Sequence, residues 1–292
     1  MDECLQALSQ QREWEGDDLL VAQVKIQLIT EQLTRANAQS PDGIPPDYVL
    51  AALRTQLQTT KAQLPVHLQQ NGMSFSGPCY SLFTSDASQD TILSHISYTE
   101  LAIHEVSITQ PKAAFRGTVS DMQRYEALEA CLSAAREWFD RHFSIPSYVY
   151  IGMTFSYWWN MAHCLLTLYR LTVLDDPAWD RRAVKNRIDL LAILDRLRVG
   201  FEEVAAQRRL ETGPTVEEDS FTKFVKMSWS MKSNWAPELA AVEGSPDSAE
   251  SAATMPAGVI LDGGNEGLNM PFFQPEDSET WIAGLFDMNW EI

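Results

Sequence analysis

The sequence predicts an all-α protein, a multi-helix bundle followed by a largely disordered acidic C-terminal tail. Through most of the first 240 residues, apolar side chains recur at steps of three and four, the spacing of one face of an α-helix. No segment alternates convincingly between apolar and polar residues, as a strand with one buried face does. Proline and glycine separate the periodic segments, so we expect a series of helices joined by turns and loops.

Two helices are expected near the N-terminus. The first covers roughly residues 17–36, where apolar side chains recur at four-residue steps. Proline and glycine at positions 41–43 break the pattern. Pro46 then precedes a second amphipathic stretch, and Pro65 stops it. The short connection predicts a helical hairpin.

Two more helices are expected in the middle of the chain, after a loop at residues 66–85. The third is marked by apolar residues between positions 92 and 108. The fourth follows from about Val119 to His142 and ends at Ile145-Pro146, because the residue before a proline disfavours helical geometry.

The segment from Phe155 to Leu174 is apolar nearly all round, which predicts a helix buried at the centre of the bundle with Thr154 as its N-cap. Asp176-Pro177 is a natural cap and first-turn pair for the next helix, whose apolar pattern continues for more than five turns to Val204. A last helix begins near Phe221 and is expected to end at Pro237.

The chain carries 40 acidic residues against 22 Lys and Arg, a formal net charge of −18. Because lysine and arginine supply most of the affinity for phosphates, direct binding to nucleic acid is not expected. Ten of the acids and no Lys or Arg lie between Ala241 and Ile292. That stretch begins with a segment rich in Gly, Ser, Pro and Ala, a composition that cannot bury enough apolar surface to order itself.

Neither a secretory signal nor a membrane span is expected. The N-terminus mixes acidic and polar residues, and polar side chains interrupt the long apolar stretch around Trp158 to Leu174. The four cysteines lie at positions 4, 79, 131 and 164, too far apart in the sequence to hold zinc from one loop. We expect reduced cysteines, with Cys131 and Cys164 as small buried hydrophobes, and neither a cofactor nor a metal.

Several segments resemble a known family. Residues 143–180 contain the runs FSIPSYVYIGMTFSYWW and NMAHCLLTLYRLTVLDDPAWD, and further segments are DECL at 2–5, LQTTKAQLP at 57–65, LLAILDR at 190–196 and a short Trp-rich acidic end. In content and order they resemble the C-terminal regulatory region of fungal binuclear zinc-cluster transcription factors. The resemblance implies a helical regulatory domain with an acidic activating tail. Together with the composition, this divides the chain into a helical regulatory-type domain at 1–240, a disordered acidic linker at 241–275 and an acidic-hydrophobic segment at 276–292.

The DNA-reading function of that family does not carry over. It depends on six closely spaced cysteines followed by a basic stretch, and neither feature occurs in this sequence. The resemblance therefore implies a regulatory or effector module without a DNA-binding domain of its own, acting in the nucleus or alternatively in the cytoplasm. Such a module is expected to sense a small molecule and to contact a coactivator.

The C-terminal segment is the candidate coactivator contact. Acidic residues there alternate with bulky apolar ones and keep them solvated until a partner groove accepts them, which is typical of segments that fold on binding. The candidate contact residues are Trp281, Ile282, Leu285, Phe286 and Trp290. The alternative is that this end packs back on the bundle as a closing helix.

A stand-alone enzyme of secondary metabolism, derived from such a domain, is the alternative function. The sequence holds no phosphate-binding loop, nucleophile elbow or HExxH motif. The remaining chemistry is a cofactor-independent isomerisation or cyclisation, pericyclase-like, in an apolar pocket that holds a small-molecule substrate by proximity and orientation. The candidate catalytic residue is His163, as a general acid or base.

Both functions need a small-molecule site, and aromatic residues are densest around the predicted central helix. The candidate ligand-binding residues are Tyr150, Trp158, Trp159, His163 and Tyr169, with packed core aromatics as the alternative interpretation. Neighbours on a helix diverge by about 100°, so Trp158 and Trp159 cannot both line one cavity. Since His163 lies four residues beyond Trp159, those two share a face and are the preferred pair.

Overall fold

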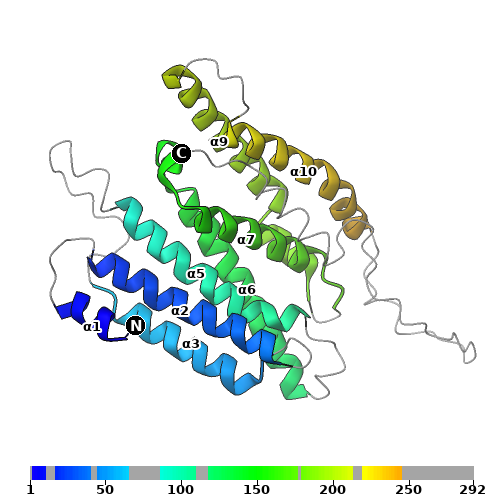
Figure 1. Cartoon of the computed structure of the whole chain (residues 1–292). Coiled ribbons are helices and arrows are strands. Elements are labelled where there is room, and N and C mark those ends of the chain that lie inside the picture. The colour runs from blue at the N-terminus through cyan, green and yellow to red at the C-terminus, as the bar shows by residue number, and fades with distance from the viewer. Residues whose placement is uncertain are drawn as a thin grey trace, which may run out of the picture. The chain divides into compact units, whose positions relative to one another are not determined.

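The computed structural model describes residues 2–10, 17–40, 45–65, 86–109, 118–176, 179–212 and 219–244. All regular secondary structure within these ranges is helical (Figure 1), which confirms the all-α prediction. By its internal contacts the chain divides into two compact units, Met1–Gly200 and Phe201–Ile292. None of the described helices is long and apolar enough to cross a membrane.

Within the described residues, the first unit contains eight complete helical elements and the start of a ninth. In chain order these are α1 (Asp2–Gln10), α2 (Asp17–Gln39), α3 (Asp47–Ala62), α5 (Asp86–Thr109), α6 (Thr118–His142), the 3₁₀ helix η2 (Ser147–Gly152), α7 (Phe155–Val173), α8 (Arg181–Arg187) and the beginning of α9 (Leu190–Thr212). The second unit contains the rest of α9 and α10 (Ser220–Gly244).

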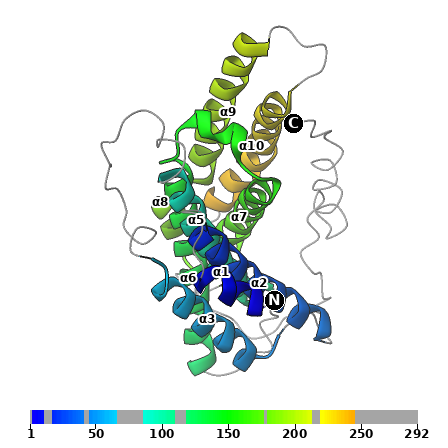
Figure 2. The same cartoon turned by 60° about the vertical axis from the view of Figure 1, so that its left-hand side comes forward.

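Three helices at the N-terminal side share one apolar core. α2, α3 and α5 lie side by side (Figure 1 and Figure 2), and each contributes buried apolar side chains to this core. The core side chains include Ala22, Ile26, Ile29 and Leu33 of α2, Leu50, Leu53 and Leu57 of α3, and Ile92, Ile96, Ile103 and Val106 of α5. The sequence separation within each helix is three, four or seven residues, so helical periodicity alone brings these side chains to one face. This confirms the paired N-terminal helices.

α5 also packs against α6 and α7, which places it between the N-terminal core and the rest of the first unit. α7 matches the predicted central helix, because buried side chains occur on nearly every side of it. Its predicted N-cap differs in one respect. Thr154 occupies the cap position, but its hydroxyl bonds the Ser156 hydroxyl at 2.9 Å and no backbone N–H of the helix.

The helix expected from Asp176-Pro177 to Val204 is wrong as a single element. Asp180, not Asp176, caps α8, its carboxylate accepting from the backbone N–H groups of Arg182 at 2.9 Å and Ala183 at 3.1 Å. α8 then ends at Arg187, and Asp189 caps α9 by accepting from two backbone N–H groups of its first turn. Because each carboxylate satisfies N–H groups that a continuous helix would bond internally, the chain breaks into two helices with one apolar stripe.

The predicted end of the last helix at Pro237 is also wrong, because α10 continues to Gly244 and includes the first four residues of the expected linker. Pro237 and Ser233 are both exposed, so water can reach the carbonyl that proline leaves without an N–H donor. The expected loop at 66–85 and residues 245–292, with the candidate coactivator contacts, lie outside the described residues.

Candidate functional site

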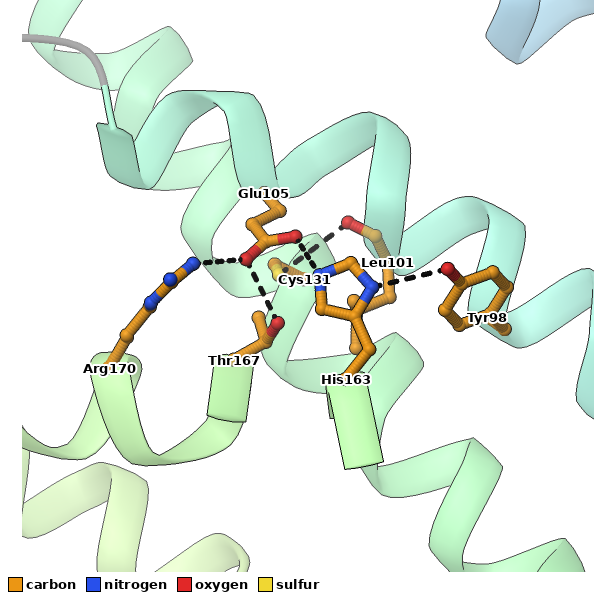
Figure 3. Close-up of polar contacts among 7 residues, drawn as sticks. All are labelled: Tyr98, Leu101, Glu105, Cys131, His163, Thr167 and Arg170. Atoms are coloured by element: carbon orange, nitrogen blue, oxygen red, sulfur yellow. Dashed lines mark hydrogen bonds and ion pairs between the residues drawn. The ribbon is translucent and has the colours of Figure 1, made fainter. Parts of the chain in front are cut away.

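The candidate site lies between α5 and α7, within the first unit. α5 contributes Tyr98 and Glu105, which are seven residues apart and therefore on one face of the helix. α7 contributes His163, Thr167 and Arg170, whose spacing of four and three also selects one face. Figure 3 shows the five side chains converging from the two helices.

The Glu105 carboxylate is the centre of this cluster. One oxygen, Oε2, lies 2.5 Å from His163 Nε2. The other, Oε1, accepts from Arg170 Nη1 at 2.7 Å and from the Thr167 hydroxyl at 3.1 Å (Figure 3). Three donors from α7 therefore converge on one side chain of α5.

Glu105 is held in its charged form. Burial by itself would raise the pKa of this carboxyl group, but the charge and hydrogen bond of His163, the charge of Arg170 and the hydrogen bond of Thr167 outweigh it and lower the pKa to about 2. The carboxylate is therefore ionised at any physiological pH. A buried charge of this kind is stable only while its partners remain in place.

His163 joins Glu105 to Tyr98. With Nε2 donating to the carboxylate, Nδ1 faces the Tyr98 hydroxyl at 3.2 Å, and the two rings meet edge to face at 5.6 Å. The neutral ring accepts the Tyr98 O–H at Nδ1, whereas the imidazolium donates there. A side-chain hydrogen bond between Trp159 and the Tyr98 hydroxyl acts to lower the pKa of Tyr98. The result is a hydrogen-bonded chain of four side chains.

Tyr98 remains protonated in this chain. Burial raises the pKa of its hydroxyl far above the usual value, and the negative charges that Cys164 and Glu105 can carry add to the effect. Tyr98 thus serves as a hydrogen-bond donor and acceptor and not as a phenolate. Its neighbour His163 is the residue that connects Tyr98 to the Glu105 carboxylate.

The side chains of the cluster differ in their exposure to solvent. Side-chain exposure is 11% at Glu105, 29% at His163 and 42% at Arg170. A group arriving from solvent can therefore reach the imidazole and the guanidinium but not the carboxylate that orients them. Chemically, this arrangement can bind a polar group of a ligand or exchange a proton with it.

A second aromatic cluster surrounds His142, the last residue of α6. Its ring stacks on Trp138 at 5.4 Å and on Tyr150 at 4.9 Å, and Trp158 meets it edge to face at 6.3 Å. His142 Nδ1 shares a 3.0 Å hydrogen bond with the Tyr157 hydroxyl. Burial, aided by the charge of Arg196, lowers the pKa of His142 to about 3, so this ring is neutral.

The structure thus divides the predicted ligand-binding residues between two places. Trp159 and His163 meet at Tyr98, whereas Tyr150 and Trp158 pack around His142. The divergence of the two neighbouring tryptophans is confirmed. Tyr169 is buried further along α7 on the Trp158 face. A cavity beside His163, and the roles of these residues, remain predictions.

Two residues of the candidate site were missed in the sequence, Tyr98 and Glu105. A signal for Glu105 is present, since it is an acid between the apolar residues Ile103 and Val106 of α5, and a buried acid requires a partner. Its partner could not be named, because the pairing joins residues 58 positions apart. Tyr98 carries no comparable signal.

Two buried thiols lie beside the site. Cys131 of α6 contacts the carbonyl oxygen of Leu101 at 3.8 Å (Figure 3). Burial raises the pKa of both Cys131 and Cys164 well above that of a free thiol. Both are therefore uncharged at neutral pH, which confirms their prediction as small buried hydrophobes.

The Glu105 network should make stability depend on acid. Because its folded pKa of about 2 lies below the usual 4.5, the carboxylate contributes stability above pH 4.5 that is lost as the pH falls toward 2. Between pH 7 and pH 3, the difference in the free energy of unfolding between wild type and Glu105→Gln should shrink by about 2 kcal/mol. Urea unfolding of both proteins at each pH measures this difference. The exposed Glu126→Gln is the control, and an equal difference for Glu105→Gln at both pH values would contradict the ionised network.

His142 should contribute in a higher pH range. Its folded pKa of about 3 lies below the usual 6.5, so stability is complete above pH 6.5 and is lost as the pH falls and the unfolded chain takes up a proton. His142→Phe should reduce the pH slope of unfolding between pH 6 and pH 4 by about 1.4 kcal/mol per pH unit. Tyr157→Phe removes the hydrogen bond but not the titration and should keep the wild-type slope. An unchanged slope in His142→Phe would show that the ring is not buried neutral.

Comparison with known proteins connects this helical chain to transcription factors. The profile of a family described as a C-terminal domain matches residues 146–288. Transcription factor opdL of Penicillium oxalicum is 29% identical over 261 residues, which cover 86% of this chain and 42% of that protein. A transcription factor of Aspergillus terreus is 29% identical over 213 residues, 67% of this chain and 33% of that protein.

The chain spans less than half the length of either relative. No solved structure matches it. The family match begins just before η2 and contains α7, so it includes His163, Thr167 and Arg170, whereas α5 with Glu105 precedes it. These matches confirm the resemblance predicted from the sequence: the chain is similar to a regulatory region of fungal transcription factors.

Proposed function

We propose that this chain is a regulatory module of transcription that acts in the nucleus, responds to a small molecule at the α5–α7 cluster and contacts a coactivator through residues 276–292. The observation that carries the proposal is its similarity to a transcription factor over 86% of its length. The site and the composition of the C-terminal segment suggest how such a module receives and transmits a signal.

The α5–α7 cluster supports the sensing part of the proposal. Small-molecule sites combine aromatic walls with a few fixed polar groups. Here Trp159 supplies an aromatic surface beside Tyr98, and His163 and Arg170 supply partly exposed polar groups held in position by Glu105. A ligand that competes with Glu105 for Arg170 would change a contact between two helices, which gives binding a structural consequence.

The C-terminal segment supports the output part. Residues 276–292 contain five acids, no Lys or Arg, and the bulky residues Trp281, Ile282, Leu285, Phe286 and Trp290. Apolar side chains placed among acids bind hydrophobic grooves by folding on contact. Aromatic residues in such contacts commonly dominate the binding energy.

The alternative is a cofactor-independent isomerase or cyclase in the same place, favoured by one specific observation. Glu105, His163 and Tyr98 form a continuous hydrogen-bonded series in which the carboxylate orients the imidazole. A histidine fixed in this way can serve as a general acid or base. Binding with conversion would favour the enzyme, whereas binding without conversion favours the sensor.

The output can be tested by fusing the full chain to a heterologous DNA-binding domain in a yeast reporter strain. We expect activation, and we expect the double change Trp281→Ala and Phe286→Ala to reduce it severalfold, because losing one aromatic anchor costs at least about 2 kcal/mol of partner binding. Tyr48→Ala, at an exposed position on α3, is the control. A fusion that is stably expressed and inactive would contradict the coactivator role.

The input can be tested by screening the purified chain against a library of aromatic acids and phenols by native mass spectrometry, with product analysis of every hit. Trp159→Ala and His163→Gln should each weaken binding about tenfold, the effect of losing one hydrogen bond or stacking contact. Tyr125→Phe, at an exposed tyrosine of α6, should bind normally. Hits whose affinity is the same in all three variants would place the ligand elsewhere.

A further inference from the structure

α10 of the second unit has a buried and an exposed face. Its buried side chains recur at three- and four-residue steps and comprise Phe221, Phe224, Ser228, Met231, Trp235 and Leu239. Phe224 stacks on Phe201 of α9 at 5.1 Å, and Arg209 donates to the Thr222 hydroxyl at 3.0 Å. These contacts fix which side of the helix faces inward.

The exposed side of α10 carries an aromatic residue with an exposed lysine, Lys226, on one side of it and a half-buried lysine, Lys232, on the other. Trp229 is 65% exposed, although tryptophan is usually well buried. Lys226 lies three residues before it and Lys232 three residues after it, the spacing of neighbours on a helix. From Ser220 to Pro237 the helix has three lysines and no acid. In a chain of net charge −18, this surface has the opposite sign to the whole.

A surface of this kind fits a partner that is both acidic and apolar. Tryptophan offers a large contact area with little entropy to lose and is enriched at interfaces. Flanking lysines add attraction for carboxylates and cover apolar surface with their stems.

The same chain contains a segment with this chemistry. Residues 276–292 carry Glu276, Asp277, Glu279, Asp287 and Glu291 together with two tryptophans and a phenylalanine. Thirty-one residues separate Gly244 from Glu276, and a chain of that length can reach up to about 100 Å. Trp229 lies only about 22 Å back along α10 from Gly244, at 1.5 Å per residue. The residues between Gly244 and Glu276 are therefore long enough to let residues 276–292 reach Trp229.

We propose that residues 276–292 dock on the exposed face of α10 around Trp229 of the same chain, with the exposed Lys226 facing the acids. Attachment through 31 residues gives the segment an effective concentration on the order of 1 mM at this surface. For a contact with a Kd of about 100 µM, docked chains would then outnumber undocked chains about tenfold. Such a contact is weak enough for a competing partner to displace. The surface is thus an interaction site for the chain's own acidic-aromatic segment.

Other occupants fit less well. A nucleic acid would meet the lysines but would be repelled by the remaining acidic surface. A second copy of the chain would offer the same segment, but at micromolar protein the tethered copy has the higher local concentration. Measurements in solution can distinguish binding of a nucleic acid, and docking on a second copy, from docking within one chain.

Hydrogen exchange of the full chain tests the proposal. In the wild type, amides of residues 276–292 should exchange about tenfold more slowly than in an unstructured peptide of the same sequence. Trp229→Ser and Lys226→Glu should return them to the peptide rate, whereas Leu210→Ser, at an exposed leucine of α9, should not. Unchanged exchange of the buried α10 amides verifies that each variant is folded.

Three results would overturn the proposal. The first is exchange of residues 276–292 at the peptide rate in the wild type. The second is protection that survives both Trp229→Ser and Lys226→Glu, which would place the segment on another surface. The third is protection that disappears on tenfold dilution of the protein, because it would indicate docking on a second copy.

Discussion

The Glu105 carboxylate is the interaction on which the arrangement of α5 and α7 depends. It is buried and ionised, and its three donors, His163, Thr167 and Arg170, all come from α7. The hydrophobic effect is non-directional, whereas a buried charge requires its donors at fixed positions. The network therefore sets the register of two helices that apolar contacts alone would leave less defined.

α5 consequently contacts different helices with two of its faces. One face contributes Ile92, Ile96 and Ile103 to the apolar core shared with α2 and α3. The other presents Tyr98 and Glu105 to α7. A change at the α7 contact is thus transmitted to a helix already anchored in the N-terminal core, so a ligand acting on His163 or Arg170 has a rigid element to act against.

Most of the fold could be predicted from the sequence, because helical periodicity of apolar residues is a local property. The helix boundaries that were predicted wrongly also have local causes, but these causes are not apolar periodicity. Asp189 divides one apolar stripe into α8 and α9 through side-chain bonds to the backbone, and α10 continues through Pro237 on an exposed side. Periodicity reports which face is buried, but it does not report where a carboxylate replaces a backbone hydrogen bond.

The site was predictable only in part. Trp159 and His163 share a face of one helix, and that relation follows from their spacing. Tyr98 and Glu105 belong to another helix, and nothing in their own sequence neighbourhood identifies α7 as the partner. Likewise, Tyr150 and Trp158 are close to His163 in sequence but surround His142 in the structure. Dense aromatics indicated the region, whereas tertiary packing decided the grouping.

The acidic charge of the chain acts differently in its two settings. Within the α5–α7 cluster the carboxylate is buried and its partners are fixed, so salt screens it little. In the segment 276–292 any attraction to lysines on α10 would act near the surface, where screening over about 8 Å at physiological ionic strength keeps it weak. A regulatory module needs both, since the buried pair preserves the structure that receives a signal while a weak surface contact can be exchanged for a partner. The lysines and Trp229 of α10 meet the second requirement because they offer charge and contact area without a buried ion to stabilise.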